Sequence, residues 1–251
     1  MMKKTILSFL LFAACSAQAW SDSFLDHLQY YARAGYNVGG TAPIGMPATI
    51  RSLEKYTLKG NVTIGIDAYW ALPKRWGMMG GLHFENKGMK IDARVKNYHM
   101  EIRKGSESLA GMFTGYVQTD VEQWMITLPL QATYDVSSKV RLKMGPYFSY
   151  VASKNFSGAA YNGYLRQDDP TGPKVELGSD DGERGTYDFS DDMRRWQFGI
   201  DAGCDWYFSH RWGAYAGLTW GLTEVFKKDF HTIEQALYPI YGTIGIIYQF
   251  K

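Results

Sequence analysis

Long apolar segments are scarce in this chain of 251 residues, although hydrophobic residues make up 45% of it. The longest apolar stretch runs only from Ile6 to Ala14, whereas a membrane-spanning helix needs about 20 consecutive apolar residues. The sequence therefore excludes a bundle of membrane helices. At this length a single domain is expected.

An excess of charge of one sign is also missing. The chain has 27 basic and 25 acidic residues, which leaves a net charge of +2. No basic run is interleaved with stacking aromatic residues, as nucleic-acid binding would require. The charge pattern therefore argues against nucleic acid as a partner.

The N-terminus has the pattern of an export signal. A basic pair, Lys3 and Lys4, precedes the apolar stretch, and Ala17-Gln18-Ala19 forms a small-residue cleavage site. We predict a signal peptide at residues 1–19 and a mature domain at residues 20–251. Lipoprotein processing at Cys15 is the alternative, because Ala13 and Ala14 precede it.

Cysteine is nearly absent, since Cys15 and Cys204 are the only two. Cleavage after Ala19 would leave only Cys204. A single cysteine can form neither an intramolecular disulfide nor a cysteine metal site.

Strict alternation of apolar and polar residues is the strongest pattern that the sequence does contain. Even positions from Val62 to Leu72 are apolar, while the odd positions between them are polar or small. Successive side chains of a strand point to opposite faces, so this period indicates a strand with one apolar face. Eight segments show the pattern: 30–38, 62–72, 76–85, 123–131, 140–150, 195–208, 212–223 and 243–250.

The ends of these segments favour a membrane barrel over a soluble β-sandwich, which is the alternative. Aromatic residues make up 16% of the chain, and several apolar faces carry one at each end, as in Trp212 and Trp220. Tyr and Trp suit the membrane–water boundary. A sheet in lipid must close to satisfy its backbone groups. We predict an all-β fold, a transmembrane antiparallel up-and-down β-barrel of about eight strands.

Short and long connections alternate along the chain. The short ones span 72–75, 134–139 and 208–211, and the long ones are predicted as loops at 39–59, 93–117, 154–192 and 225–237. Bacterial outer-membrane barrels have short periplasmic turns and long extracellular loops. We therefore expect a Gram-negative outer-membrane protein with both termini in the periplasm.

The C-terminal segment from Thr243 to Phe250 resembles the sorting signal of outer-membrane barrels. Three stretches of the chain resemble the small PorT-like outer-membrane β-barrel family: the hairpin 63–90, the strand pair 124–151 and the segment 196–250. The resemblance covers most of the mature chain. It implies an outer-membrane barrel of a family often labelled porin-like, and it brings no functional residues with it.

The polar faces of the strands would point into the barrel lumen. An eight-stranded barrel has an interior that side chains just fill, so buried charges there need partners. We expect these charges to pair and plug the lumen. A narrow channel or a small-ligand conduit is the alternative, and the glycine-rich inner face is consistent with it. The predicted lumen cluster is Arg33, Asp67, His83, Glu85, Lys87, Arg141, Lys143, Arg195, Asp201 and Asp205.

Catalytic, cofactor and metal sites are not expected from the sequence. A lipid A-active barrel enzyme would need a hydroxyl nucleophile with a positioned base. Glu85 shares a strand face with His83, and His99 and His231 lie in or near predicted loops, but no serine motif accompanies them. The acidic loop 154–192 could supply calcium ligands, yet it lacks the spacing of an EF-hand. We treat it as a solvated loop.

The predicted loops offer the remaining binding surfaces. The apolar segment 39–47 could cover the barrel mouth as a lid, contact a partner or serve as a simple connector. Arg94, Lys96, Arg103 and Lys104 could pair with lipopolysaccharide phosphates. We expect a monomeric, non-enzymatic barrel with a structural or loop-mediated binding role, in contact with outer-membrane lipid, lipopolysaccharide and an envelope or extracellular protein.

Overall fold

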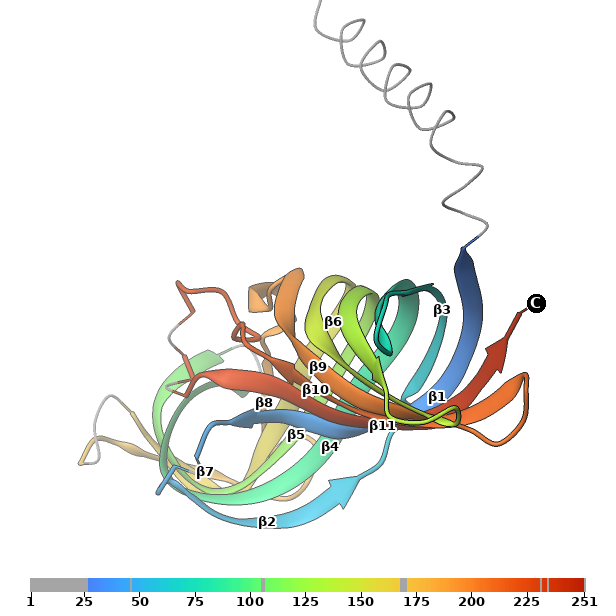
Figure 1. Ribbon diagram of the computed structural model, residues 1–251. Helices are drawn as coiled ribbons and strands as arrows, with labels where there is room; N and C mark the ends of the chain where they lie inside the picture. Colours follow the sequence, from blue (N-terminus) through green and yellow to red (C-terminus); the bar gives the residue numbers. More distant parts are fainter. Residues whose placement is uncertain are drawn as a thin grey trace, which may run out of the picture.

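The computed structural model describes residues 27–45, 47–104, 107–167, 171–230, 232–233 and 235–250, which form one antiparallel sheet of eleven strands (Figure 1). The predicted signal peptide, Cys15 and His231 lie outside the described residues. The elements are β1 (Leu28–Pro43), β2 (Ile50–Thr57), β3 (Val62–Ala71), β4 (Trp76–Lys104), β5 (Glu107–Asp135), β6 (Val140–Gln167), β7 (Lys174–Leu177), β8 (Gly185–Asp188), the 3-10 helix η1 (Ser190–Asp192), β9 (Trp196–Tyr207), β10 (Trp212–Gly221) and β11 (Leu237–Gln249).

Eight of these strands pair in a ring. The order is β1, β3, β4, β5, β6, β9, β10 and β11, and β11 pairs again with β1. Each predicted strand segment coincides with one ring strand, so the all-β up-and-down fold is confirmed. The predicted count of about eight applies to the ring alone, because β2, β7 and β8 add three further strands to the sheet.

The outer face of the ring carries an apolar belt between two levels of aromatic pairs. Large apolar side chains such as Ile66, Leu82 and Leu130 are more than half exposed there. At one level Trp76 contacts Tyr134, with ring centroids 5.0 Å apart; at the other Phe84 contacts Trp124 at 5.2 Å. An exposed apolar surface of this size is stable only in an apolar environment such as lipid. The aromatic rings at both levels suit the two membrane interfaces.

The two ends of the ring differ in length. At one end, here called the short-turn end, the links 72–75, 136–139 and 208–211 are tight, and the end of β11 lies beside the start of β1 (Figure 1). At the other, the long-strand end, β4, β5 and β6 extend far past the belt. No helix in the described part of the chain is long and apolar enough to cross a membrane.

The prediction of a loop at 93–117 was wrong. β4 and β5 run as one paired hairpin through this region, with Lys104 opposite Glu107. From Met89 to Val95 apolar and charged residues still alternate, but the apolar ones now point inward. A bulge between Val95 and Tyr98 then shifts the phase of the alternation. The outward apolar face that marks a membrane strand therefore ends here, although both strands continue.

Two other predicted loops also contain strands. In 39–59, β1 continues to Pro43 against β11, and β2 runs back along β4, so residues 39–43 of the proposed lid belong to the wall; Met46 lies outside the described residues. In 154–192, β6 continues to Gln167, and β7 and β8 pair with it. In 225–237, Val225 and Phe226 are buried.

A second apolar core explains these extensions. Beyond the belt, inward residues of β4, β5 and β6 pack together with residues of the following segments, and Phe113 at its centre is fully buried. The second core consists of Met89, Val95, Met100, Ile102, Leu109, Phe113, Val117, Val121, Phe156, Ala160, Leu165, Leu177, Tyr187, Phe189, Met193, Val225 and Phe226. Burial of so much apolar surface stabilises strands that would otherwise be solvated loops.

Candidate functional site

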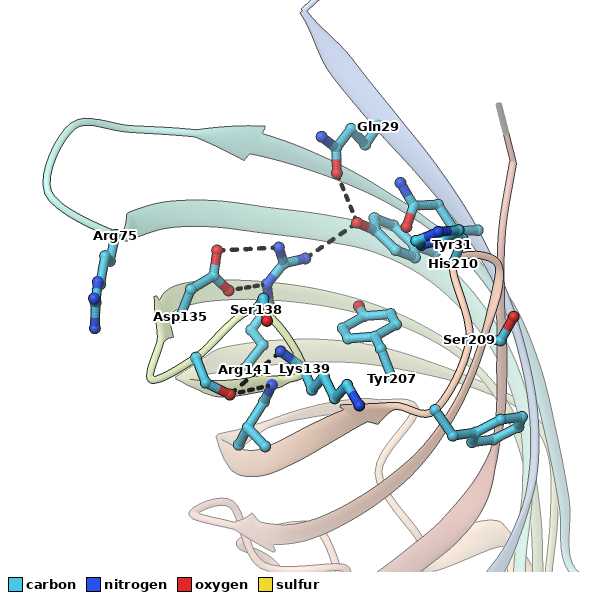
Figure 2. A pocket seen from close by; sticks show the side chains of 14 residues that line it. Gln29, Tyr31, Arg75, Asp135, Ser138, Lys139, Arg141, Tyr207, Ser209 and His210 are labelled. Atoms are coloured by element: carbon cyan, nitrogen blue, oxygen red, sulfur yellow. Dashed lines mark hydrogen bonds and ion pairs between the residues drawn. The ribbon is translucent and has the colours of Figure 1, made fainter.

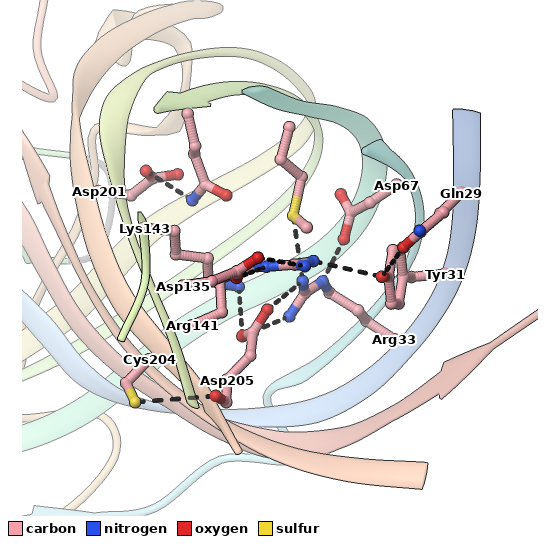
Figure 3. A network of polar contacts seen from close by, with 12 residues as sticks. Gln29, Tyr31, Arg33, Asp67, Asp135, Arg141, Lys143, Asp201, Cys204 and Asp205 are labelled. Carbon is pink, nitrogen blue, oxygen red and sulfur yellow. Dashed lines mark hydrogen bonds and ion pairs between the residues drawn. The ribbon is translucent and has the colours of Figure 1, made fainter. Parts of the chain in front are cut away.

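The lumen of the ring is filled by charged side chains, and Arg33 on β1 lies at its centre. The Arg33 guanidinium donates to both carboxylate oxygens of Asp205 on β9, at 2.9 and 2.7 Å, and to Asp67 on β3 (Figure 3). Lys143 on β6 contacts Asp205 at 2.9 Å. His83 on β4 contacts Asp67 at 2.8 Å. These five residues form the central charge layer.

The central charge layer crosses the whole lumen. In the ring order, β3 and β9 are separated by three strands on either side and are therefore opposite each other. Arg33 bridges carboxylates from both. The side chains of Arg33, Asp67 and Asp205 are at most 3% exposed, so little water reaches the bridge.

A second layer lies on the long-strand side of the first. Lys87 contacts Glu85 at 3.0 Å, and its ammonium lies 5.6 and 5.8 Å from the ring centroids of Tyr147 on β6 and Tyr241 on β11. The hydroxyl of Thr127 donates to Glu85 at 2.8 Å. Cation–π contacts and hydrogen bonds of this kind offset the cost of removing ions from water.

Amide side chains connect β5 to β9 between these charges. Gln131 donates to Asp201 at 2.8 Å, and Gln197 donates to Gln123 at 3.2 Å. All four residues are buried. Their bonds link strands that are not neighbours in the ring, so they too extend across part of the lumen.

A third layer lies near the short-turn end. The Arg141 guanidinium is held by Asp135 at 2.6 Å and lies over the ring of Tyr69, 3.6 Å from the centroid. Tyr31 and Tyr207 flank the same guanidinium at 5.8 and 5.7 Å. Arg141, Asp135, Tyr31 and Tyr207 of this layer line an open cavity of about 790 Å³ at the short-turn mouth. Lys139 and His210 also line it (Figure 2).

Two inner glycines make room for the central layer. A Cβ at Gly81 would lie 2.1 Å from the Asp67 carboxylate, and one at Gly65 would lie 2.2 Å from the His83 ring. A side chain at either position would displace a member of the layer. The glycine-rich inner face therefore serves close packing at these positions and does not enlarge the lumen there.

The structure brings together most of the predicted lumen residues. Eight of the ten, from Arg33 to Asp205, are buried, and His83 is half-buried. Arg195 differs: it lies one residue before β9, is exposed, and donates to the Ala152 carbonyl. The strand ends there, so an inward position no longer faces an enclosed lumen.

Sequence reasoning missed the groups that complete the network. Asp135 and the rings of Tyr31, Tyr69 and Tyr207 hold Arg141. Three of these four lie on the same strand faces as predicted members: Tyr31 with Arg33, Tyr69 with Asp67, and Tyr207 with Asp205. Their spacing of two residues from predicted members could therefore have identified these three tyrosines as inward-facing.

The described residues contain neither a histidine–serine catalytic pair nor a metal-binding cluster. His83 contacts Asp67, and His99 contacts the Thr232 carbonyl at 3.3 Å; neither has a serine hydroxyl as its partner there. Among the described acidic residues, histidines and cysteine, no group of three is placed to hold a metal ion. Asp168 and Asp169 of the predicted acidic loop lie outside the described residues.

Outside the lumen, Lys59 fastens the link between β2 and β3 to the wall. Its ammonium contacts Asp120 at 2.6 Å and Glu122 at 2.9 Å, both on β5. Partial burial alone would lower the pKa of Lys59, but the hydrogen bonds to Asp120 and Glu122 raise this pKa above its ordinary value. Lys59 crosses β4 at Gly88, where a Cβ would lie 3.1 Å from its side chain.

Comparison with known proteins identifies one family. The sequence model of the outer membrane protein beta-barrel domain matches residues 16–227. No curated protein matches at a significant level.

Several solved structures are similar over most of the chain. Ail, the attachment invasion locus protein of Yersinia pestis, is 10% identical, with 89% of this chain and 97% of that chain covered and a TM-score of 0.37. CarO2 of Acinetobacter baumannii is 11% identical, with 88% and 98% covered and a TM-score of 0.40. The outer membrane protein OprG of Pseudomonas aeruginosa is 12% identical, with 88% and 95% covered and a TM-score of 0.36. At these values the assignment rests on the sequence model.

Proposed function

Because this chain belongs to the outer membrane protein beta-barrel domain family, we propose that it is a non-enzymatic barrel, closed to solutes, that anchors a binding surface in the outer membrane. The observation that carries this proposal is the central charge layer, in which Arg33 joins Asp67 and Asp205 across the lumen. The proposal disfavours the alternative of a narrow porin-like channel or small-ligand conduit. Whether the chain is PorT-like in particular stays a prediction.

The proposed orientation puts the short-turn end and both termini in the periplasm. Short turns on one side and long extensions on the other support it, since outer-membrane barrels place their long connections outside the cell. The long-strand end would then be the exposed binding surface. Its second core makes it a rigid β-structure, which suits recognition better than mobile loops because less ordering entropy is lost on binding.

The proposed partners follow from this orientation. Outer-membrane lipid covers the apolar belt, and lipopolysaccharide phosphates pair with exposed cations such as Arg94 and Lys96 above it. An extracellular or envelope protein binds the long-strand end. The barrel is proposed to act as a monomer, because a closed ring leaves no free strand edge within the belt.

Cysteine labelling on intact cells tests this display. In a Cys204→Ala background, Ser108→Cys at the long-strand end is expected to react with a membrane-impermeant maleimide added outside the cells. Ser138→Cys in a short turn is the matched control, since both serines are exposed, and it is expected to react only after the outer membrane is permeabilised. The reverse labelling pattern would contradict the proposed orientation.

A further inference from the structure

The wall of the long-strand end has a seam between β1 and β2. β1 pairs with β3 only as far as Tyr36 opposite Val62. Beyond that point β2 pairs with β4, and the described residues show no backbone ladder between β1 and β2. The free edge of β1 is met there by side chains.

Side-chain contacts cross this seam, and two of them lie beyond the end of the β1–β3 ladder, at Gly39 and Thr41. The Tyr56 hydroxyl on β2 donates to the Gly39 carbonyl at 2.5 Å. The Thr41 amide of β1 donates to the sulfur of Met89 on β4 at 3.2 Å. A thioether is a weak acceptor and methionine is a flexible side chain, so this closure is weaker than a strand ladder.

Met89 packs directly on the backbone of β1 at Gly40. A Cβ at Gly40 would lie 2.6 Å from the Met89 sulfur. Met89 also lines a cavity behind the seam. Met89 therefore contacts β1 at the seam and lines the cavity behind it.

The cavity behind Met89 is small and mainly apolar. Its volume is about 90 Å³, and its lining includes Ile50, Ile91, Val95 and Phe156. By volume it could take about three water molecules, but a cavity lined by apolar side chains stays dry and binds apolar groups instead. The chemistry of the lining thus suits the end of a hydrocarbon chain.

The outside of the seam is continuous with the apolar belt. Val38 on β1, Leu58 in the link after β2, and Val62 at the start of β3 are all exposed apolar side chains. They lie on both sides of the point where the β1–β3 ladder ends. An acyl chain lying against the belt would meet these apolar side chains beside the seam.

We propose that the seam between β1 and β2 admits the end of an acyl chain of a membrane lipid into the cavity behind Met89. The site lies on the long-strand side of the charge layers. This proposal rests on the part of the proposed function that places lipid around the belt, and it does not require a closed lumen. Ion conductance through the barrel would overturn the closed-barrel function and leave this site standing.

Photo-crosslinking in nanodiscs tests the site. The purified full chain is placed in nanodiscs containing phosphatidylcholine with a diazirine at the end of one acyl chain, irradiated, and mapped by mass spectrometry. Adducts are expected on belt residues such as Leu82 and, in addition, on Met89 or Val95. Belt adducts show that the barrel is inserted, so belt adducts without cavity adducts would overturn the proposal.

A cavity-filling variant sharpens the test. Ala93→Trp places a large ring at a buried residue of the lining, and it is expected to lose the cavity adducts and keep those of the belt. Leu130→Trp on the belt is the matched control and is expected to keep both. Gly40→Leu, which pushes against Met89 from the seam, is a second blocking variant should Ala93→Trp fail to fold. Cavity adducts that persist in a folded blocking variant would overturn the proposal.

Discussion

Replacing Asp205 with alanine is expected to lower the free energy of unfolding by about 3–5 kcal/mol, the cost of breaking a buried ion pair by removing one partner. The Asp205 side chain is 0% exposed and accepts hydrogen bonds from Arg33 and Lys143. Without this carboxylate, Arg33 and Lys143 lose a buried counter-charge in a packed lumen. Equilibrium urea unfolding in lipid vesicles, followed by tryptophan fluorescence, measures the change.

Two further variants show whether this loss comes from the uncompensated charges. Asp181→Ala removes a fully exposed carboxylate at the other end of the molecule and is expected to leave the free energy of unfolding unchanged within the error of the measurement. Adding Lys143→Met to Asp205→Ala is expected to recover part of the stability, because one unpaired cation is removed with it. Wild-type stability of Asp205→Ala would mean that Arg33 and Lys143 are hydrated in the lumen.

Replacing Phe113 with alanine is expected to destabilise the long-strand end by about 3–5 kcal/mol, the range for deleting a buried phenylalanine side chain. Phe113 is fully buried in the second core, and its ring packs beside Gly115 and Gly163. The effect should be local, because the belt and the charge layers lie at a distance along the strands. Limited proteolysis is expected to cut the hairpin of β4 and β5 in this variant.

The folding of the eight-stranded ring shows whether the effect of Phe113→Ala is local. Phe113→Ala is expected to keep the heat-modifiable gel migration of a folded barrel while its long-strand end becomes protease-sensitive. Val136→Ala, which shortens an exposed apolar side chain in a short turn, is the control and should keep both properties. Loss of heat-modifiable migration in Phe113→Ala would show that the two cores fold as one unit.

Alternation along the sequence was sufficient to predict the ring. A half-buried strand repeats every two residues, and eight such segments separated by turns leave few arrangements other than a barrel. The same parity placed Arg33, Asp67 and Asp205 on inner faces. Apart from Arg195, which precedes β9, parity assigned the predicted charges to the interior.

Partners across the lumen could not be predicted in the same way. Which residue of β9 faces Arg33 depends on the stagger between strands around the whole ring, and that stagger is not a local property of any segment. The long-strand end was missed for a different reason. Past the belt the apolar residues of β4 point inward and the charged ones outward, and the bulge between Val95 and Tyr98 then shifts the phase of the alternation.

Single-channel recording in planar bilayers tests the closed lumen most directly. Purified wild-type protein, inserted in concentrated KCl, is expected to show no stepwise conductance, because Arg33, Asp67 and Asp205 span the ring and the second and third layers fill the lumen on either side. The variant Arg33→Ser/Asp205→Ser, which removes the bridge, is the matched comparison. Salt-dependent conductance steps in the wild-type protein would contradict the closed barrel.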